Sequence, residues 1–293
     1  MEYHKRLAIL QSHISKLPAF PATVTKVMEI CHDVNTSPND LSRVISLDPV
    51  LTGKVMRLIN SAYFGLSQEV ISLVRAIIML GMNTVKNLAL GAAVVSTLGK
   101  SANFQALNMD LFWQHSLAVG VISKLIAKNC NVSREQLEGF FIAGLLHDIG
   151  KIPLNSKFSD EYRLAMETSD RKHQPLSISE KQFLGIDHTQ AGNLIMENWK
   201  LGTEIIDTVT YHHSPKTYEG EQKDILFTVI LANYFANSSG IGFSGNRCFE
   251  EIWPGVFQHL GTYTDISLDY FRDLFDEVNR EIEKAQIFLK ISK

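Results

Sequence analysis

The sequence contains little cysteine, and its few cysteines suit neither a disulfide framework nor a cysteine metal site. Among its 293 residues are three cysteines, Cys31, Cys130 and Cys248, which are odd in number and far apart. That pattern favours reduced thiols in a cytoplasm over the paired cysteines of a small secreted protein. We therefore expect a cytoplasmic protein whose core forms without disulfides, as a chain of this length allows.

Long apolar runs are also missing, which argues against a membrane protein. The most apolar stretch, Leu88 to Leu98, is about half the length that a helix needs to cross a bilayer. The chain opens with Met-Glu-Tyr-His-Lys-Arg and no apolar run follows, so the pattern of a signal peptide is not present. We expect neither export nor a membrane partner.

An excess of charge of one sign is lacking as well. The 28 Lys and Arg residues are balanced by 31 Asp and Glu residues, for a formal net charge of -3. Proteins that bind nucleic acid usually present a strongly basic face, so no nucleic-acid partner is expected, although a small local basic patch remains compatible. With 45% hydrophobic and 20% charged residues, the composition is that of a globular protein. The length fits two domains or one large unit.

Proline is sparse, at eight residues, and few segments alternate between apolar and polar residues as strands do. Helical spacing of three and four is present instead from the start of the chain, at Leu7, Leu10, Ile14 and Leu17. Ser37-Pro38 and Asp48-Pro49 each combine an N-cap residue with proline at the first helical position. These patterns predict an all-α fold.

The same reasoning divides the rest of the chain. Helices are predicted over 110–129, 133–149, 177–199, 203–213, 225–237 and 268–291. A polar break at 99–108 suggests an N-terminal helical subdomain (1–105), a helical core (106–240), and a loop with C-terminal helices packed on that core (241–293). The Gly/Ser-rich stretch 238–246 is predicted to be a mobile loop, with a lid as the alternative.

One pair of residues carries most of the chemical information. His147-Asp148 follows the apolar segment 140–146, so both side chains are expected to be buried. An ionised carboxylate there is costly unless it is paired or binds a metal. For the pair alone, a bond between the two side chains or to Lys151 is the favoured explanation, ahead of a metal. Spacing does not show whether the more distant histidines, such as His115 and His188, converge on it.

Several motifs carry a resemblance to a known family. His115 together with the segment 145–151, Leu-Leu-His-Asp-Ile-Gly-Lys, resembles the HD superfamily of metal-dependent phosphohydrolases. Further motifs are similar, more narrowly, to the HDOD domain (HD-related output domain): 17–21, 48–51, 60–65, 80–82, 185–188, 191–192, Trp199 and 211–213. The resemblance covers roughly residues 15 to 215. It implies an N-terminal helical bundle packed on an HD-like helical core of the phosphohydrolase type.

The resemblance also implies a set of site residues. The positions that match metal ligands of HD-type folds are His115, His147, Asp148, His188, His212 and His213. In such folds these side chains face one cavity and hold one or two divalent metals. Histidine and carboxylate ligands suit Fe, Mn, Ni or Zn, among which the sequence does not choose. Lys151 matches a lysine that related hydrolases place against phosphate or metal-bound anions, which implies a catalytic role.

Three departures from the family pattern bear on catalysis. Asn233 stands where the metal site usually closes with an Asp, so a ligand oxygen remains but its charge is lost. Leu111 stands where some related hydrolases have an acidic ligand. After His213 the chain continues Ser-Pro-Lys, so the Gly-Tyr-Pro signature of the cyclic-dinucleotide hydrolases is missing.

These observations leave three functions open. The leading hypothesis is a bacterial signalling protein with a metal-binding pocket, which acts through contacts with other signalling proteins and has little or no turnover. The alternative is an active metal-dependent phosphohydrolase, with a nucleotide, cyclic dinucleotide or other phosphorylated small molecule as ligand. The third is a structural adaptor with an empty pocket. No receiver, cyclase or sensor domain is recognisable, so we expect the input to come from a separate protein or a small ligand.

Overall fold

The computed structural model describes residues 2–16, 21–31, 33, 35–99, 106–248, 250–261 and 268–291, and these residues contain helices but no strand. The first group of helices is α1 (Glu2–Ile14), α2 (Ala22–Ile30), α3 (Pro38–Ile45), α4 (Pro49–Ile59), α5 (Leu73–Leu80) and α6 (Met82–Leu98). The second group is α7 (Met109–Asn129), α8 (Leu137–Leu146), α9 (Lys151–Lys157), α10 (Ser159–Lys172), α11 (Leu176–Leu184) and α12 (His188–Asn198). The last group is α13 (Thr203–Tyr211), the short 3-10 helix Pro215–Thr217, α14 (Lys223–Ser238), α15 (Pro254–Leu260), α16 (Leu268–Ala285) and α17 (Ile287–Lys290). The all-α prediction is confirmed.

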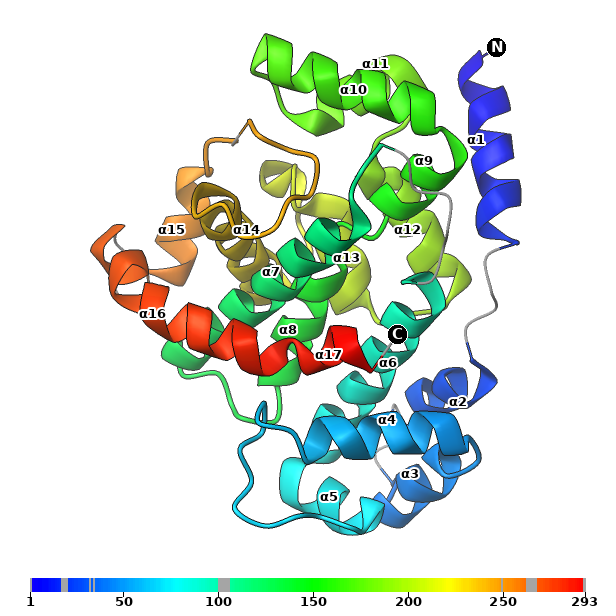
Figure 1. Cartoon of the computed structure of the whole chain (residues 1–293), viewed down its shortest axis with the longest axis vertical. Coiled ribbons are helices and arrows are strands. Elements are labelled where there is room, and N and C mark those ends of the chain that lie inside the picture. The colour runs from blue at the N-terminus through cyan, green and yellow to red at the C-terminus, as the bar shows by residue number, and fades with distance from the viewer. Residues whose placement is uncertain are drawn as a thin grey trace.

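The helices α2 to α6 form an N-terminal bundle, which occupies one end of the molecule in Figure 1. Its helix starts follow the sequence signals. Ser37 caps α3 through a capping box with Asp40, and the Asp48 side chain accepts a hydrogen bond from Leu51 N at the start of α4. Caps of this kind satisfy backbone N–H groups that a helix leaves free at its start. The bundle closes as α4 and α5 pack on α6.

Helix α1 lies apart from this bundle and packs on α9 and α12 (Figure 1). Its apolar side, with Leu10 and Ile14 buried, therefore contacts the second half of the chain. Helix α6 joins the halves by packing on α8, and one hydrophobic cluster of described residues runs from Leu10 to Ile291. The domain boundaries drawn from the sequence remain a prediction.

The core that positions the site is built on α7, which packs closely on α8 and α14. A Cβ added to Gly144 would lie 2.8 Å from Gly120 Cα and 2.8 Å from Val119 O. No side chain fits at that contact, so glycine lets α7 and α8 approach until the ring centroids of His115 and His147 are 5.8 Å apart. The close approach of α7 and α8 therefore determines how near His115 and His147 lie to each other.

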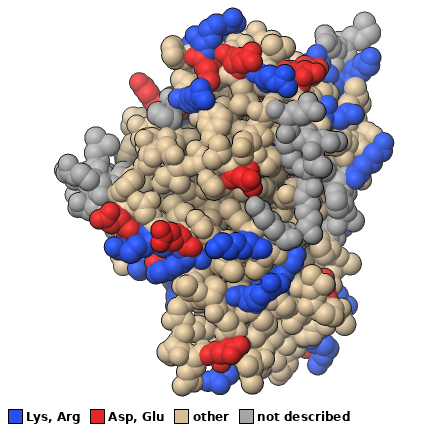
Figure 2. All heavy atoms as spheres, viewed as in Figure 1, with Lys and Arg blue, Asp and Glu red and all other residues tan. Residues whose placement is uncertain are grey.

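A polar cluster also links the bundle to this core. Tyr63, in the 60–65 motif, places its hydroxyl 3.2 Å from Glu138 Oε2 on α8, and Lys124 Nζ on α7 lies 2.9 Å from the same hydroxyl. Lys124 and Glu138 form an ion pair. The C-terminal helix α16 packs on α7 from the other side. Figure 2 shows acidic and basic side chains side by side in the region of this helix.

Three predicted helices differ from the structure, and one of them, 268–291, is interrupted at Gln286 between α16 and α17. The helix expected over 177–199 is broken, because Gly185 adopts a left-handed conformation (φ 81) that ends α11. Asp187 then caps α12 in a capping box with Gln190, which makes His188 the first residue of a new helix. The helix expected from Ser133 begins at Leu137, after a turn in which Gln136 N bonds to Ser133 O. The motif residues 17–20 and most of the polar break, 100–105, lie outside the described residues.

No single helix among the described residues has the length and hydropathy to cross a membrane. The pair α5 and α6 reaches the threshold together, by length and composition, but is bent by 116° at the break. Most of α6 is buried against its neighbours.

Candidate metal centre

Six predicted ligands come from four places in the fold and meet at one buried point. His115 comes from α7, His147 and Asp148 directly follow α8, His188 begins α12, and His212 and His213 directly follow α13. Their helices are held together near Asp148 by close backbone packing. A Cβ on Gly150 would lie 1.9 Å from His188 O, so only glycine lets the turn after Asp148 meet the start of α12.

The donors form two overlapping groups. Asp148, His188, His212 and His213 offer ligand atoms within 4.8 Å of one another, and so do His115, His147 and Asp148. Asp148 belongs to both groups, and its side chain is about 1% exposed. Asp148 would therefore help to hold a cation in either group.

The backbone sets the orientation of two of these rings. His147 Nδ1 lies 2.7 Å from Gly144 O, and His212 Nδ1 lies 3.0 Å from Val209 O. A carbonyl oxygen only accepts, so each Nδ1 carries the hydrogen and each Nε2 is left with its lone pair. This is the tautomer that binds a metal through Nε2.

Carboxylates orient two further rings in the same sense. His188 Nδ1 lies 2.6 Å from Glu180 Oε2, and His213 Nδ1 lies 3.0 Å from Glu250 Oε1. Their Nε2 atoms face one another at 3.0 Å. Pairing of a metal-bound histidine with a carboxylate on its other nitrogen is common in metalloproteins.

Several buried polar atoms at the centre have no hydrogen-bond partner among the described residues. They include His147 Nε2, Asp148 Oδ1 and His115 Nδ1. Such atoms are costly in a protein interior. His188 Nε2 lies 3.3 Å from Asp148 Oδ1, and His212 Nε2 lies 3.6 Å from it. A cation would satisfy these inward-facing lone pairs together, so the donor set fits a divalent metal.

Asn233 on α14 reaches the same centre. Its Oδ1 lies 3.0 Å from His115 Nε2 and accepts a hydrogen bond of 2.8 Å from Asn237 Nδ2. The amide oxygen therefore stands beside the group that contains His115. Leu111, one turn before His115, is 39% exposed and offers no ligand atom.

Lys151, predicted as catalytic, is buried beside Asp148. Its Nζ lies 2.7 Å from Asp148 Oδ2 and 3.3 Å from Ser244 Oγ. In this arrangement its charge balances the carboxylate. The catalytic role remains a prediction.

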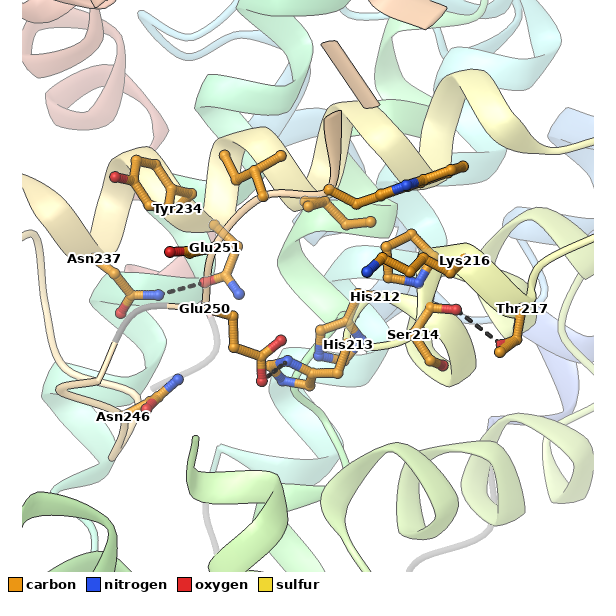
Figure 3. A pocket seen from close by; sticks show the side chains of 15 residues that line it. His212, His213, Ser214, Lys216, Thr217, Tyr234, Asn237, Asn246, Glu250 and Glu251 are labelled. Carbon is orange, nitrogen blue, oxygen red and sulfur yellow. Dashed lines mark hydrogen bonds and ion pairs between the residues drawn. The ribbon is translucent and has the colours of Figure 1, made fainter. Parts of the chain in front are cut away.

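A pocket of about 350 Å³ opens beside His212, His213 and Asn233 (Figure 3). One wall carries Lys216, and the loop 239–252 contributes other lining residues, including Glu250. Together with the donor set, the pocket offers a ligand access to the edge of the centre.

Sequence comparison identifies the family. The HDOD domain matches residues 17–215, which is more than half of the chain. The chain belongs to the HDOD domain family. The resemblance noted from the sequence motifs is thereby confirmed.

Solved structures agree with this HDOD fold. An HDOD domain protein of unknown function from Geobacter sulfurreducens has a TM-score of 0.77 at 23% identity, covering 97% of this chain and 98% of that one. A proposed signal transduction protein from Marinobacter aquaeolei VT8 has a TM-score of 0.73 at 22% identity, covering 100% and 66%. At these identities the likeness establishes the fold alone.

Curated relatives are longer proteins. An uncharacterized protein of Treponema pallidum (strain Nichols) is 21% identical over 229 residues, and ribonuclease Y of Mycoplasmoides gallisepticum is 23% identical over 268 residues. The matches cover 78% and 89% of this HDOD chain but 44% and 39% of the relatives. The chain thus spans less than half of the length of these relatives.

Charges inside the HDOD pocket favour an ionised Asp148. Burial alone would raise the pKa of Asp148, but the adjacent ring of His147 and the charge of Lys151 outweigh burial and hold this pKa well below 3.8. The carboxylate is therefore negative at neutral pH, as a metal ligand must be.

Two of the histidines are held neutral by their surroundings. Burial, with a further contribution from His147, lowers the pKa of His115 to about 3. Burial and the nearby His213 lower the pKa of His212 well below 6.5. For His188 burial acts in the same direction, but Glu180 outweighs it and raises the pKa above 6.5. The neutral imidazoles of His115 and His212 are in the state that binds metal.

The stretch 238–246, predicted to be a mobile loop, packs closely against the core at several of its residues. Ser244 and Asn246 are 1% and 8% exposed, and Phe243 N donates to Leu111 O at 3.0 Å. Gly242 has φ +68, and a Cβ there would lie 2.3 Å from His115 N. The glycine that made the loop look mobile instead allows it to pack against α7.

Sequence reasoning missed the carboxylates that orient the rings. Glu180 precedes His188 by eight residues across the break at Gly185, and Glu250 lies 37 residues beyond His213. Glu180 and His188 lie on different helices, and Glu250 is far from His213 in the sequence, so no local pattern marks either carboxylate. The full burial of Glu180, at 0% exposure, is visible only in the folded chain.

Proposed function

We propose that this chain is a cytoplasmic bacterial signalling protein whose HDOD pocket binds one or two divalent metals and whose output passes through contacts with other signalling proteins. The observation that carries the proposal is the pair of overlapping donor groups that share Asp148. Four of the histidines present Nε2 inward, each held by a partner at Nδ1.

The donors suit a first-row divalent ion. Imidazole nitrogens with one carboxylate fit Fe, Mn, Ni or Zn better than Mg or Ca, which prefer oxygen. Such an ion supplies Lewis acidity and lowers the pKa of bound water. Among this chain's own residues, Asp148 would join the two positions and Lys151 would balance its charge.

Little turnover is proposed because the ligand set holds few negative charges. Asp148 is the only carboxylate in the two donor groups, Asn233 brings a neutral oxygen, and Leu111 brings none. Two divalent ions at such a site would be poorly neutralised, which weakens binding of the second. Two-metal hydrolysis needs both.

Protein contact as the output is supported by the N-terminal bundle. Its surface carries large exposed apolar side chains: Leu47 (66%), Val50 (67%), Ile71 (88%), Ile78 (68%) and Met79 (43%). These side chains are available for contact with a partner protein.

A metal-dependent phosphohydrolase is the second candidate, favoured by the pocket beside His212 and His213. Its volume of about 350 Å³ suits a small molecule, and Lys216 on its wall offers a charge for a phosphate or nucleotide. A structural relative from Shewanella amazonensis SB2B is likewise a proposed phosphohydrolase.

The test is metal analysis of untagged protein purified without chelators, followed by activity assays. Wild type should contain a first-row divalent metal, and the double variant His147→Ala with Asp148→Ala should contain none. His259→Ala, at a histidine bonded to Asp224 on the surface, is the matched control and should keep the metal.

The assays distinguish the three functions. Absent or very slow hydrolysis of phosphodiesters and cyclic dinucleotides by metal-loaded wild type supports the signalling proposal. Robust metal-dependent turnover would replace it with the phosphohydrolase. If the wild type takes up no metal after reloading, the structural adaptor with an empty pocket is the function that remains.

A further inference from the structure

Glu250 reaches the centre from a side where the sequence predicts no ligand. It lies in the loop 239–252 after α14, and its Oε1 is 3.0 Å from His213 Nδ1 (Figure 3). On the opposite edge of the ring, His213 Nε2 lies 3.0 Å from His188 Nε2 at the centre. The carboxylate therefore contacts the back of a ring whose front is a candidate ligand.

The part of the loop that precedes Glu250 makes three contacts with the helical core. Ser244 Oγ accepts a hydrogen bond of 3.3 Å from Lys151 Nζ, and Phe243 N donates to Leu111 O. Arg247, between these contacts and Glu250, forms an ion pair of 3.1 Å with Asp170. These contacts place the segment 243–247 against α7, α9 and α10, and the Glu250 carboxylate itself contacts His213.

We propose that Glu250 is a positioning residue of the metal centre, which fixes the orientation and tautomer of the His213 ring. This inference rests on the proposed metal binding. A carboxylate on Nδ1 locks the proton there, turns the Nε2 lone pair inward and makes that nitrogen a stronger donor. Glu180 has the same relation to His188, so both ends of the His188–His213 contact are held by an acid.

The neighbouring Glu251 provides a matched control. It carries the same charge, lines the same pocket and is one residue away. No hydrogen bond or ion pair joins it to a described histidine of the centre. A general electrostatic effect of the pocket would therefore appear in Glu251→Gln as well, whereas positioning of His213 would appear in Glu250→Gln alone.

The experiment is a Co²⁺ titration of metal-free full-length protein at neutral pH, followed by visible absorbance. We expect Glu250→Gln to weaken Co²⁺ binding by about 10- to 100-fold, as removal of such partners does in other sites, and to change the ligand-field spectrum. Glu251→Gln should match wild type. In a His213→Ala background, adding Glu250→Gln should have no further effect, because Glu250 acts through that ring.

Thermal unfolding of each metal-free variant verifies that it is folded. Three outcomes would overturn the role of Glu250 and leave metal binding itself untouched. Glu250→Gln could bind Co²⁺ as tightly as wild type, or Glu251→Gln could weaken binding equally. The effect of Glu250→Gln could also persist in the His213→Ala background. A wild type that binds no Co²⁺ would overturn this role together with the proposed function.

Discussion

The N-terminal bundle and the core around α7, α8 and α14 are both packed helices, but they bury different chemistry. In the described part of the bundle from 35 to 99, the buried polar side chains are Ser42, Thr84 and Asn87, all uncharged. The core buries charged groups, among them Asp148 and Lys151. Burying charge is costly even when it is paired. The bundle is thus built for packing, whereas the core carries groups that stability alone does not explain.

The largest effect is expected when the two regions are separated, which tests whether each can fold without the other. Fragments 1–105 and 106–293 should each be poorly soluble or molten, because α6 packs on α8 and α1 packs on α9 and α12. Cutting the chain exposes the apolar faces at these contacts. Circular dichroism melts and size-exclusion chromatography measure the outcome. Two monomeric fragments with sharp, independent melts would show that the regions are separate domains.

A pair of substitutions, one in each region, tests whether metal binding depends on the core and not on the bundle. Asp148→Ala leaves the buried Lys151 without its partner, which should cost about 3–5 kcal/mol of unfolding free energy and abolish metal binding. Leu58→Ala in the bundle should cost about 2–5 kcal/mol through the cavity it creates, with metal content unchanged. Denaturant unfolding and metal analysis give the two quantities. Loss of metal in Leu58→Ala, or retention in Asp148→Ala, would contradict the division of roles.

Much of the bundle could be predicted from the sequence, because its signals are local. Ser37-Pro38 and Asp48-Pro49 cap helices in the structure as their residue types indicate. Outside the bundle, the break at Gly185 was not predicted, because the apolar spacing continues across it and glycine is tolerated inside helices. In both cases only a few neighbouring residues decide the outcome.

The centre was predictable only in part, because it depends on contacts between distant segments. His147-Asp148 stood out by its apolar surroundings, and the family resemblance supplied the other ligands. The spacing of His115 and His188 contains no sign that they meet. Neither the apolar surroundings nor the family motifs indicated Glu180 and Glu250. Both contact the outer nitrogens of the rings and belong to none of the motifs.

Metal addition should stabilise the core directly. A ligand that binds the folded state alone adds about 2.7 kcal/mol at a concentration of 100 times its Kd, which corresponds to a rise in Tm of roughly 5–10 °C for a chain of this size. Differential scanning fluorimetry of metal-free protein, with and without Mn²⁺ or Zn²⁺, measures the shift. The His147→Ala, Asp148→Ala double variant should show no shift, and an equal rise there would locate the binding elsewhere.

Acid should destabilise the metal-free core. The pKa of His115 is about 3 in the folded state against 6.5 as its ordinary value, so the unfolded chain takes up the proton first as the pH falls. Stability from this group is present above pH 6.5 and is lost toward pH 3. His212, with its lowered pKa, acts in the same direction, and His188, with its raised pKa, acts in the opposite one.

The net expectation is a Tm that falls between pH 6.5 and 4.5 in the presence of chelator. His115→Gln removes one of the two histidines, His115 and His212, whose lowered pKa destabilises the folded state in acid. The fall in Tm should therefore be shallower in this variant. A Tm that is constant or rises over this range in wild type would show that the centre is not held neutral as described.

The smallest expected effect concerns the charge that the centre lacks at Asn233. Its Oδ1 lies 3.0 Å from His115 Nε2, so Asn233→Asp places a carboxylate beside the group of His115, His147 and Asp148. Added negative charge should tighten metal binding there by about tenfold, about 1.4 kcal/mol at a partly screened site. A second bound ion would then also permit slow hydrolysis of phosphodiesters.

Ser238→Asp is the control for this change, because it adds the same charge at the exposed last residue of α14, where the side chain bonds to Phe235 O and not to Asn233. Metal titration and a phosphodiesterase assay should respond to Asn233→Asp and not to Ser238→Asp. If neither quantity changes in Asn233→Asp, the missing carboxylate at 233 does not limit the centre. The apolar Leu111, which offers no ligand one turn before His115, would then be the better explanation for weak occupancy of the second position, and Leu111→Glu would be the variant that restores it.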